Sequence, residues 1–531
     1  MIDFKQWEIY FMKNKKVLKT INNLYREDKN FLNSFSYINN SFVATLGFGN
    51  YKFNELTIKL WAQALADELK GQNLKILIAH DGSNDNFSSY TNSISNIFKA
   101  NKMQPFVFFK QAPISKNFIK FVLNKIDGIN LVIYLSKYTY DNNYAISIFD
   151  GRGMPVAFKF LEKIVNRLDS TTLNDINEFE DEANFLDFNK LLNEYVAEII
   201  KYNHTQSGNK LITIGIVLDN LSESFIKRIM GKNDIGYQFV KNKFLEDKPK
   251  VINLPLTSTA KFKNINYIFK FSYDFQKLYI YKKIRRFSFV PRYELIDINE
   301  LIANYLIFIN SILKTNDLAK NIQAIKSTLF TKNNLFESIA KKYDLSYNVG
   351  FFYEGSQDSE IINLFFNENY EINLGFSHSR YGDAFLAASI FTDMFNYYET
   401  QHMKFDDIKN HNLIQIDDLL ISNFSFVCDP KNLESFETKI FSQVTLNQIP
   451  VTKVDDLREN IFNKEKYLAK IHFESNEWIG IKYSYELKRL LFVCQENKKT
   501  RGNLSQNLKK YFATTLRNYV KPIIPELDES E

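Results

Sequence analysis

A serine stands at the end of a short apolar run that has the length and composition of a buried strand. The run covers residues 131–135, and Ser136 follows it at the point where the chain is expected to leave the strand. Open α/β sheets place their reactive groups at such strand ends. Ser136 is therefore a candidate reactive residue. The simpler alternative is a serine that only caps or turns the chain, because loops commonly carry serine for that purpose.

The stretch around this serine, residues 127–147, resembles the phosphoserine loop of the α-D-phosphohexomutases, the family of phosphoglucomutases and phosphomannomutases. The family reads T-A-S-H-N-P and then Y-N-G-Y-K, whereas this chain reads Y-L-S-K-Y-T and then D-N-N-Y-A. Ser136 keeps the position of the serine that the family phosphorylates, and Lys137 replaces the histidine that follows it. The resemblance implies a catalytic role for these two residues only if the other active loops are intact.

A second stretch, residues 272–278, matches the family's metal loop, D-P-D-A-D-R-L. The three aspartates of that loop fall on Ser272, Asp274 and Gln276, and its arginine falls on Lys277. Mg²⁺ takes hard oxygen ligands, usually with carboxylates among them. One carboxylate beside a lysine is a poor donor set, so we expect no Mg²⁺ at Asp274 and no other cofactor. If the chain is an active mutase, Mg²⁺ is the cofactor that the resemblance implies.

The two substrate loops of the family are matched in position and altered in composition. The sugar loop, G-F-E-E-S, corresponds to L-G-F-S-H-S, in which Ser377 and His378 replace the glutamates and Ser379 follows. The phosphate loop, R-P-S-G-T-E-P-K, places its arginine and serine on Lys482 and Ser484. A tyrosine and a glutamate come next, and they would crowd and repel a phosphate.

The first active loop of the family, G-T-G-G-L-R-G, corresponds to A-T-L-G-F-G-N, in which Gly49 stands at the arginine position. Loss of the arginine, the metal triad and both glutamates removes the positioning and charge stabilisation on which phosphoryl transfer depends. The matching helices are better preserved than any of these loops. Lys137 and Lys277 could still attract an anion, so weak binding of a phosphosugar stays open.

Alternating strand and helix patterns must position these loops. Strands are expected at residues 75–79 and 106–109, and helices at 88–100 and 116–125, before the strand that leads to Ser136. This alternation is typical of an α/β fold with a doubly wound sheet. With the resemblance, it predicts a four-domain phosphohexomutase-like architecture around a central cleft. Three α/β domains with mixed sheets would cover residues 1–205, 206–315 and 316–430, and a smaller α+β C-terminal domain would cover 431–531.

Composition and charge limit the classes of partner. The formal net charge of +6 is small for 531 residues and is spread along the chain, so we expect no nucleic-acid binding. The longest helical apolar stretch, residues 301–313, is too short to span a bilayer, and the first residues lack the plan of a signal peptide. Two distant cysteines without metal spacing are typical of a reducing compartment. We expect a cytoplasmic protein without membrane insertion.

Three functions stay open from the sequence. The first is a catalytically inactive phosphohexomutase homologue that acts as a structural or protein-interaction subunit of a larger assembly, with other protein subunits as partners. Aromatic residues in its altered loops would suit a filled cleft or a protein interface. The second is an active phosphoglucomutase or phosphomannomutase that interconverts hexose 1- and 6-phosphates. The third is a sugar-phosphate sensor without turnover. We favour the first, because all the active loops are altered together.

Overall fold

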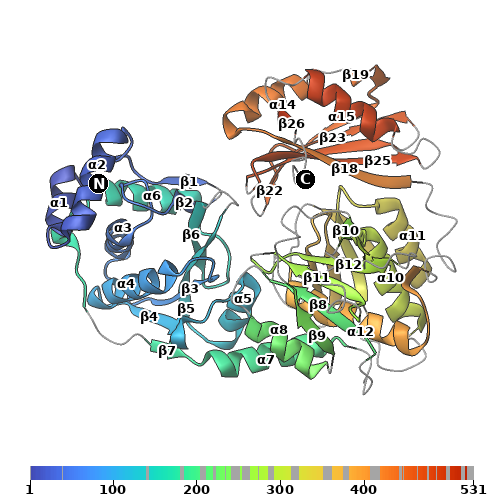
Figure 1. Cartoon of the computed structure of the whole chain (residues 1–531), viewed down its shortest axis with the longest axis horizontal. Helices are drawn as coiled ribbons and strands as arrows, with labels where there is room; N and C mark the ends of the chain where they lie inside the picture. Colours follow the sequence, from blue (N-terminus) through green and yellow to red (C-terminus); the bar gives the residue numbers. More distant parts are fainter. Residues whose placement is uncertain are drawn as a thin grey trace, which may run out of the picture. The chain divides into compact units, whose positions relative to one another are not determined.

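The computed structural model of the chain (Figure 1) consists of two compact units. Unit 1 contains Met1–Asn203, Ile212–Leu295 and Asp383–Ile390, and unit 2 contains His204–Leu211, Ile296–Gly382 and Phe391–Glu531. The division into four domains at the predicted boundaries stays a prediction. The structure describes residues 2–522 except 39, 139–142, 180–183, 204–210, 219–222, 234, 241–250, 254–263, 273, 285–291, 313–321, 351–361, 375–381, 407–418, 442–444, 447, 463–464, 475–476, 486, 498–502 and 516–520. None of the helices in these ranges is long and apolar enough to cross a membrane.

Unit 1 begins with a seven-stranded mixed sheet. Its strands are β1 (Ser36–Ile38), β2 (Ser41–Thr45), β3 (Lys75–His80), β4 (Gln104–Phe108), β5 (Ile129–Lys137), β6 (Asn143–Asp150) and β7 (Asn184–Leu186), in the order β1-β2-β6-β5-β3-β4-β7. Strands β5, β3, β4 and β7 run parallel, as the alternating pattern predicts. β6 is antiparallel to β5, because the connection between them is too short for a helical crossover, and it also pairs antiparallel with β2.

Helices pack against this sheet, and the one predicted at residues 116–125 has those bounds in the structure. They are α1 (Phe4–Phe11), α2 (Lys15–Glu27), α3 (Glu55–Glu68), α4 (Asn86–Ala100), α5 (Lys116–Lys125), α6 (Phe158–Ser170) and α7 (Phe188–Ile200), with short turns η1 (Phe109–Gln111) and η2 (Leu173–Asp175). Helix α3 starts at a capping box between Asn54 and Thr57. It is buried along most of its length, because apolar residues cover most of its surface outside a polar stripe at Glu55, Lys59, Gln63 and Asp67.

A six-stranded sheet completes the larger elements of unit 1. Its strands are β8 (Thr213–Val217), β9 (Gly236–Phe239), β10 (Val251–Asn253), β11 (Tyr267–Phe271), β12 (Leu278–Ile284) and β13 (Arg292–Leu295), in the order β10-β13-β12-β11-β8-β9, with helix α8 (Glu223–Lys232). β11 pairs in parallel with β8 and antiparallel with β12. The β11–β12 hairpin carries the loop that resembles the metal loop, at the position that the sequence predicts.

Unit 2 contains a four-stranded sheet in the order β15-β14-β16-β17. Its strands are β14 (Ile322–Thr328), β15 (Ser346–Gly350), β16 (Ile362–Phe366) and β17 (Ile372–Leu374). The helical segments of unit 2 near this sheet are α10 (Ile298–Ile307), the π turn η5 (Phe308–Ile312), α11 (Asn333–Tyr343) and the part of α12 (Ala384–Thr400) that follows Ile390. The turn between β16 and β17 and the loop between β14 and α11 become important for the candidate site.

The C-terminal sheet of unit 2 has helices on one face. Its strands are β18 (Leu419–Val427), β21 (Lys453–Asp456), β22 (Ile461–Phe462), β23 (Glu465–His472), β24 (Trp478–Ser484), β25 (Arg489–Asn497) and β26 (Lys521–Pro522), with the separate pair β19 (Thr445–Leu446) and β20 (Ile449–Pro450) and the turn η6 (Pro430–Asn432). Helices α14 (Leu433–Phe441) and α15 (Asn503–Thr515) lie together on this sheet (Figure 1). The mixed α/β architecture confirms the predicted fold class.

Strand β24 shows how the two faces of the C-terminal sheet differ. Successive side chains of a strand point to opposite faces. Ile479, Ile481 and Tyr483 pack in the core beneath α14 and α15. Trp478, Gly480 and Lys482 therefore belong to the other face, where Trp478 packs with a second apolar cluster.

Candidate functional site

Ser136 lies inside strand β5 rather than after its end, which corrects the sequence expectation. The strand continues to Lys137 because it pairs with β6 in a hairpin, where Ser136 is opposite Ala145. The residue is 4% exposed. A phosphoryl group on serine carries close to two negative charges at neutral pH and needs surrounding donors. The burial of Ser136 leaves little room for such a group.

Asp81, which directly follows β3, places a carboxylate beside this strand. Its Oδ1 accepts hydrogen bonds from the Ser83 backbone N–H at 2.9 Å and the Ser83 hydroxyl at 2.6 Å. Its Oδ2 accepts one from the Lys137 N–H at 2.8 Å, and its own N–H donates to the carbonyl of Leu135 at 3.0 Å. These bonds tie the end of β3 to the end of β5. Asp81 thus has a structural task at the strand ends, and its charge would repel a phosphoryl group.

The loop that resembles the metal loop closes on itself. The Ser272 hydroxyl donates to Asp274 Oδ1 at 2.7 Å and accepts from the Lys277 N–H at 3.0 Å. The backbones of Ser272 and Lys277 are also joined, N–H to carbonyl, at 3.0 Å. The Gln276 N–H donates to the same Oδ1 at 3.3 Å. One oxygen of the single carboxylate is therefore already engaged by donors of the loop.

The middle of this loop is anchored by an aromatic side chain. Phe275 has φ +55° and is buried, and its ring stacks on Phe385 with centroids 4.7 Å apart. Its carbonyl accepts a hydrogen bond from the Ala384 N–H at 2.9 Å. Phe385 in turn stacks on Phe225. Apolar packing of Phe275 thus holds the middle of the loop in place.

These residues do not fit a divalent metal. Mg²⁺ prefers near-octahedral oxygen ligands and is usually bound through carboxylates, whereas this loop offers one carboxylate, a hydroxyl, an amide and a lysine. In the part of the chain that the structure describes, no group of three or more His, Cys, Asp or Glu side chains could hold a metal ion. The prediction that the protein works without Mg²⁺ stays a prediction, and no step is derived through a metal.

Asp274 and the Ser136 strand nevertheless lie in one neighbourhood. Burial raises the pKa of Tyr134, on β5, well above its usual value, and the charges of Asp81 and Asp274 raise it further. The Tyr134 hydroxyl donates to the carbonyl of Ile114 at 2.8 Å. Asp81, which follows β3, and Asp274, in the β11–β12 loop, therefore both influence the same side chain of β5.

The loop that resembles the family's first active loop is shaped by glycine. Gly49 has φ +124°, a conformation that residues with a side chain rarely adopt. A Cβ atom there would lie 3.3 Å from the Tyr51 ring and 3.4 Å from the carbonyl of Phe31. The arginine that the family carries at this position would be strained here.

The N-terminal helices hold this loop from the other side. The side chain of Asn50 is buried, accepts from Trp7 Nε1 at 2.9 Å and donates to the carbonyl of Ile2 at 2.8 Å. Phe48 packs edge-to-face on Trp7 and Phe11 of α1. Trp7 is fully buried. The loop is thus part of a packed core and not a mobile binding loop.

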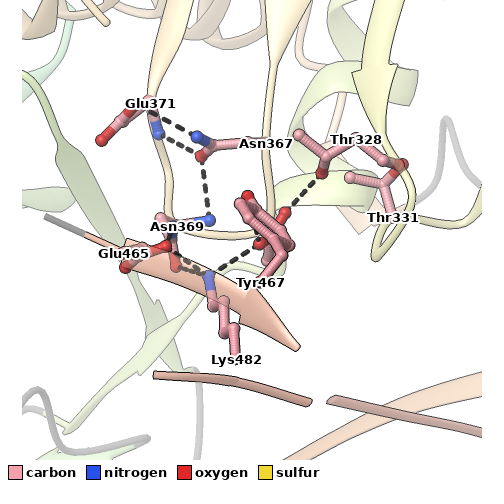
Figure 2. A network of polar contacts seen from close by, with 9 residues as sticks. Thr328, Thr331, Asn367, Asn369, Glu371, Glu465, Tyr467 and Lys482 are labelled. Atoms are coloured by element: carbon pink, nitrogen blue, oxygen red, sulfur yellow. Dashed lines mark hydrogen bonds and ion pairs between the residues drawn. The ribbon is translucent and has the colours of Figure 1, made fainter. Parts of the chain in front are cut away.

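Lys482, at the position of the family's phosphate-binding arginine, lies in a buried polar network of unit 2 (Figure 2). Its side chain is 1% exposed, and its ammonium donates to Glu368 Oε1 at 2.7 Å, Glu465 Oε2 at 2.8 Å and Asn369 Oδ1 at 2.5 Å. Burial alone would lower the pKa of Lys482, but the carboxylates of Glu368 and Glu465 raise it above its ordinary value. The cation is therefore fully committed within the protein.

Further hydrogen bonds extend this network through the β16–β17 turn. The Tyr467 hydroxyl donates to Glu368 Oε1 at 3.2 Å, and the Thr328 hydroxyl donates to the other oxygen of Glu368. Asn369 Nδ2 donates to Glu465 Oε2 at 2.5 Å. Asn367 Oδ1 accepts from the Asn369 N–H at 2.9 Å and fixes the turn. The network is rigid, because nearly every polar atom in it has a hydrogen-bond partner in the protein.

The remaining predicted site residues have no described role in binding. The Ser484 hydroxyl is buried and accepts a hydrogen bond from the Leu487 N–H at 3.2 Å, which caps the β24–β25 turn. Ser377, His378 and Ser379 lie outside the described residues. The structure thus brings Ser136 and Asp274 into one unit and places Lys482 and Ser484 in the other.

The acidic partners of Lys482 were missed from the sequence. Glu368 lies in a turn, N-E-N-Y-E, and Glu465 begins β23, and neither position stood out by spacing. A usable signal was present at Lys482 itself. A lysine within the apolar strand W-I-G-I-K-Y-S must be buried, and buried lysines are almost always paired with an acidic group.

Comparisons with known proteins agree with this architecture. Neither a family model nor a curated protein sequence matches the chain. Among solved structures, a phosphoglucomutase/phosphomannomutase family protein from Burkholderia thailandensis aligns over 90% of this chain and 97% of its own, with 8% identity and a TM-score of 0.59. Parafusin, a phosphoglucomutase from Paramecium, aligns over 88% of this chain and 93% of its own, with 13% identity and a TM-score of 0.57. The chain therefore has the fold of the phosphoglucomutases and phosphomannomutases.

Proposed function

We propose that this protein is a catalytically inactive phosphohexomutase homologue that acts as a structural or protein-interaction subunit of a larger cytoplasmic assembly. The fold supports the relationship, and the chemistry of the altered loops supports the loss of activity. Among the described residues of those loops, the burial of Ser136 and the stacking of the buried Phe275 ring support a rigid, packed protein without this activity.

The observation that carries the proposal is the state of Lys482. An ammonium group has three N–H donors, and Glu368, Asn369 and Glu465 accept all three. Two carboxylates surround one cation, so the local net charge is negative. A phosphate at this position would find no free donor on Lys482 and would be repelled by the surplus carboxylate.

Two further sites support the same conclusion. The Ser272–Asp274 hydrogen bond and the stacked Phe275 ring leave a donor set that does not suit Mg²⁺. The conformation of Gly49 disfavours an arginine. Phosphoryl transfer relies on positioning and charge stabilisation by all of these groups together, so their joint replacement costs far more than any single one.

A coupled mutase assay tests the loss of activity. Glucose 1-phosphate and mannose 1-phosphate are supplied with the matching hexose 1,6-bisphosphate and Mg²⁺, and an active phosphoglucomutase is run alongside. We expect no turnover above background for the wild-type chain and no phosphate on the Ser136 peptide by mass spectrometry. Turnover that Ser136→Ala abolishes would establish an active mutase instead.

Calorimetric titration with glucose 1-phosphate separates an inactive subunit from a sugar-phosphate sensor. We expect no saturable heat at millimolar ligand, whereas saturable binding without turnover would favour the sensor. Native mass spectrometry of the complex purified from its source tests the subunit role. The proposal requires partner proteins at fixed stoichiometry, and a chain that is always recovered alone would refute that part.

A further inference from the structure

Two regions of unit 2 that lie far apart in the sequence meet on the face of the C-terminal sheet that carries no helices. One region belongs to the four-stranded sheet and consists of the β14–α11 loop and the β16–β17 turn. The other is formed by β23, β24 and β25. Both apolar and polar contacts join the two regions.

The apolar contact is a phenylalanine seated on a glycine. Phe330, from the β14–α11 loop, is fully buried and clusters with Tyr467, Trp478 and Val493 of the C-terminal sheet. A Cβ atom on Gly480 would lie 2.6 Å from two atoms of the Phe330 ring. Only glycine, which has no Cβ atom, leaves room for the ring in this position. The Phe330 ring therefore fills a gap on this face of the sheet, and we call it the Phe330 plug.

A lysine holds the backbone of the same loop. Lys470 of β23 pairs with Gly480 across the strands, so both lie on one face. Its ammonium donates to the carbonyl of Leu329 at 2.8 Å and lies 4.2 Å from the centroid of the Trp478 ring. The residue next to the plug is thus fixed by a charge-assisted hydrogen bond.

The polar contact is the network around Lys482. Glu368 and Asn369 come from the β16–β17 turn, whereas Lys482, Glu465 and Tyr467 come from the C-terminal sheet. Every bond from Lys482 to Glu368 and Asn369 therefore crosses from one sheet to the other. Side chains at both ends are nearly inaccessible, with Glu368 at 5% and Glu465 at 8%. Removing one partner from such a network is costly, because it leaves an uncompensated charge on the groups that stay buried.

We propose that these contacts form a permanent clamp, consisting of the Phe330 plug, the Lys470 bond and the Lys482 network, that locks the four-stranded sheet and the C-terminal sheet into one rigid body. Unit 2 then has no hinge between them, so the C-terminal sheet cannot rotate to open or close over a ligand. The clamp stands independently of whether the chain has mutase activity, because it rests only on the contacts within unit 2.

Distance measurement between two spin labels tests the clamp in the full chain. Lys341→Cys on α11 and Lys509→Cys on α15 place one label on each side, and both positions are exposed. The native cysteines, Cys428 and Cys494, are buried and do not compete for the label. We expect one narrow distance distribution in the wild-type background, unchanged on adding glucose 1-phosphate.

Three variants then separate the clamp from general destabilisation. Glu368→Ala removes the acceptor of three side chains, and Phe330→Ala removes the plug; each should add a second, longer distance population. Glu496→Gln is the matched control, because Glu496 is a buried carboxylate of the same sheet whose partners Ser422 and Ser505 lie on that sheet and on α15. It should leave the distribution narrow.

Two results would overturn the proposal. One is a broad distribution in the wild-type background, which would show that the two sheets move. The other is a distribution that stays narrow in both Glu368→Ala and Phe330→Ala. Should either variant fail to fold, Phe330→Leu and Glu368→Gln replace them as milder changes, and the wild-type distribution alone still decides whether unit 2 is rigid.

Discussion

Lys470 and Lys482 lie on the same face of one sheet, and their pKa values are shifted in opposite directions. Burial lowers the pKa of Lys470 to about 8, because its nearest acceptor is a neutral carbonyl. Lys482 is buried more deeply, yet the two carboxylates beside it raise its pKa. Burial alone therefore does not decide the pKa of a lysine, because the charge of its hydrogen-bond partner can reverse the direction of the shift.

The lowered pKa of Lys470 gives stability a defined pH dependence. Between pH 8 and about 10.5 the unfolded chain holds a proton on this lysine that the folded chain has lost. Stability therefore rises with pH across this window, by up to about 3 kcal/mol from this residue. Urea unfolding of wild type and Lys470→Met, measured every half unit of pH, should give curves whose difference changes between pH 8 and 10.5. A constant difference would contradict the assignment.

Gly480 provides a steric prediction at the same face. Gly480→Ala would place its Cβ 2.6 Å from the Phe330 ring. Overpacking of a filled core costs about 1–3 kcal/mol, so the urea midpoint of unit 2 should fall by a corresponding amount. The double variant Phe330→Leu with Gly480→Ala should recover part of this loss. If the double variant is as unstable as the sum of both changes, the contact is not the cause.

At the level of elements, the β11–β12 loop gives a metal prediction. Its Asp274 carboxylate is engaged by the Ser272 hydroxyl and lies in a loop anchored by Phe275. Isothermal titration with Mg²⁺ at millimolar concentration should show no saturable heat for wild type or for Asp274→Asn. Binding that disappears in the variant would show that the loop holds a metal after all. Mn²⁺ serves as a second probe, because it shares the preference of Mg²⁺ for oxygen ligands.

The sequence predicted elements better than it predicted contacts. Helix α5 has the bounds that the alternating pattern of strand and helix predicts. The end of β5 was misplaced, because its extension depends on pairing with β6, which no local pattern records. Glu368 and Glu465 were missed for a similar reason, since they meet Lys482 only through the tertiary fold. Local patterns thus located the elements, whereas the partners of Lys482 follow only from the tertiary fold.

At the scale of the whole molecule, the two compact units have separate cores. The core of unit 1 contains Trp7 and Trp61, and those of unit 2 contain Phe492 and Phe330. Large proteins with several cores depart from two-state unfolding. Scanning calorimetry should therefore show more than one transition. Asn50→Ala should lower one of them and Gly480→Ala another, and a single transition that both variants shift equally would contradict independent units.

The seat of Phe330 on Gly480 also restricts how this protein can evolve. The Phe330 ring fills the space that a side chain at position 480 would need, so a larger residue at 480 alone would clash with the ring and a smaller residue at 330 alone would leave a cavity. Among relatives of this chain, a residue larger than glycine at position 480 should occur together with a smaller residue than phenylalanine at position 330, because residues in direct contact tend to vary together. A sequence that has both Gly480 and Phe330 is therefore expected to keep this contact, and its two sheets are expected to stay joined.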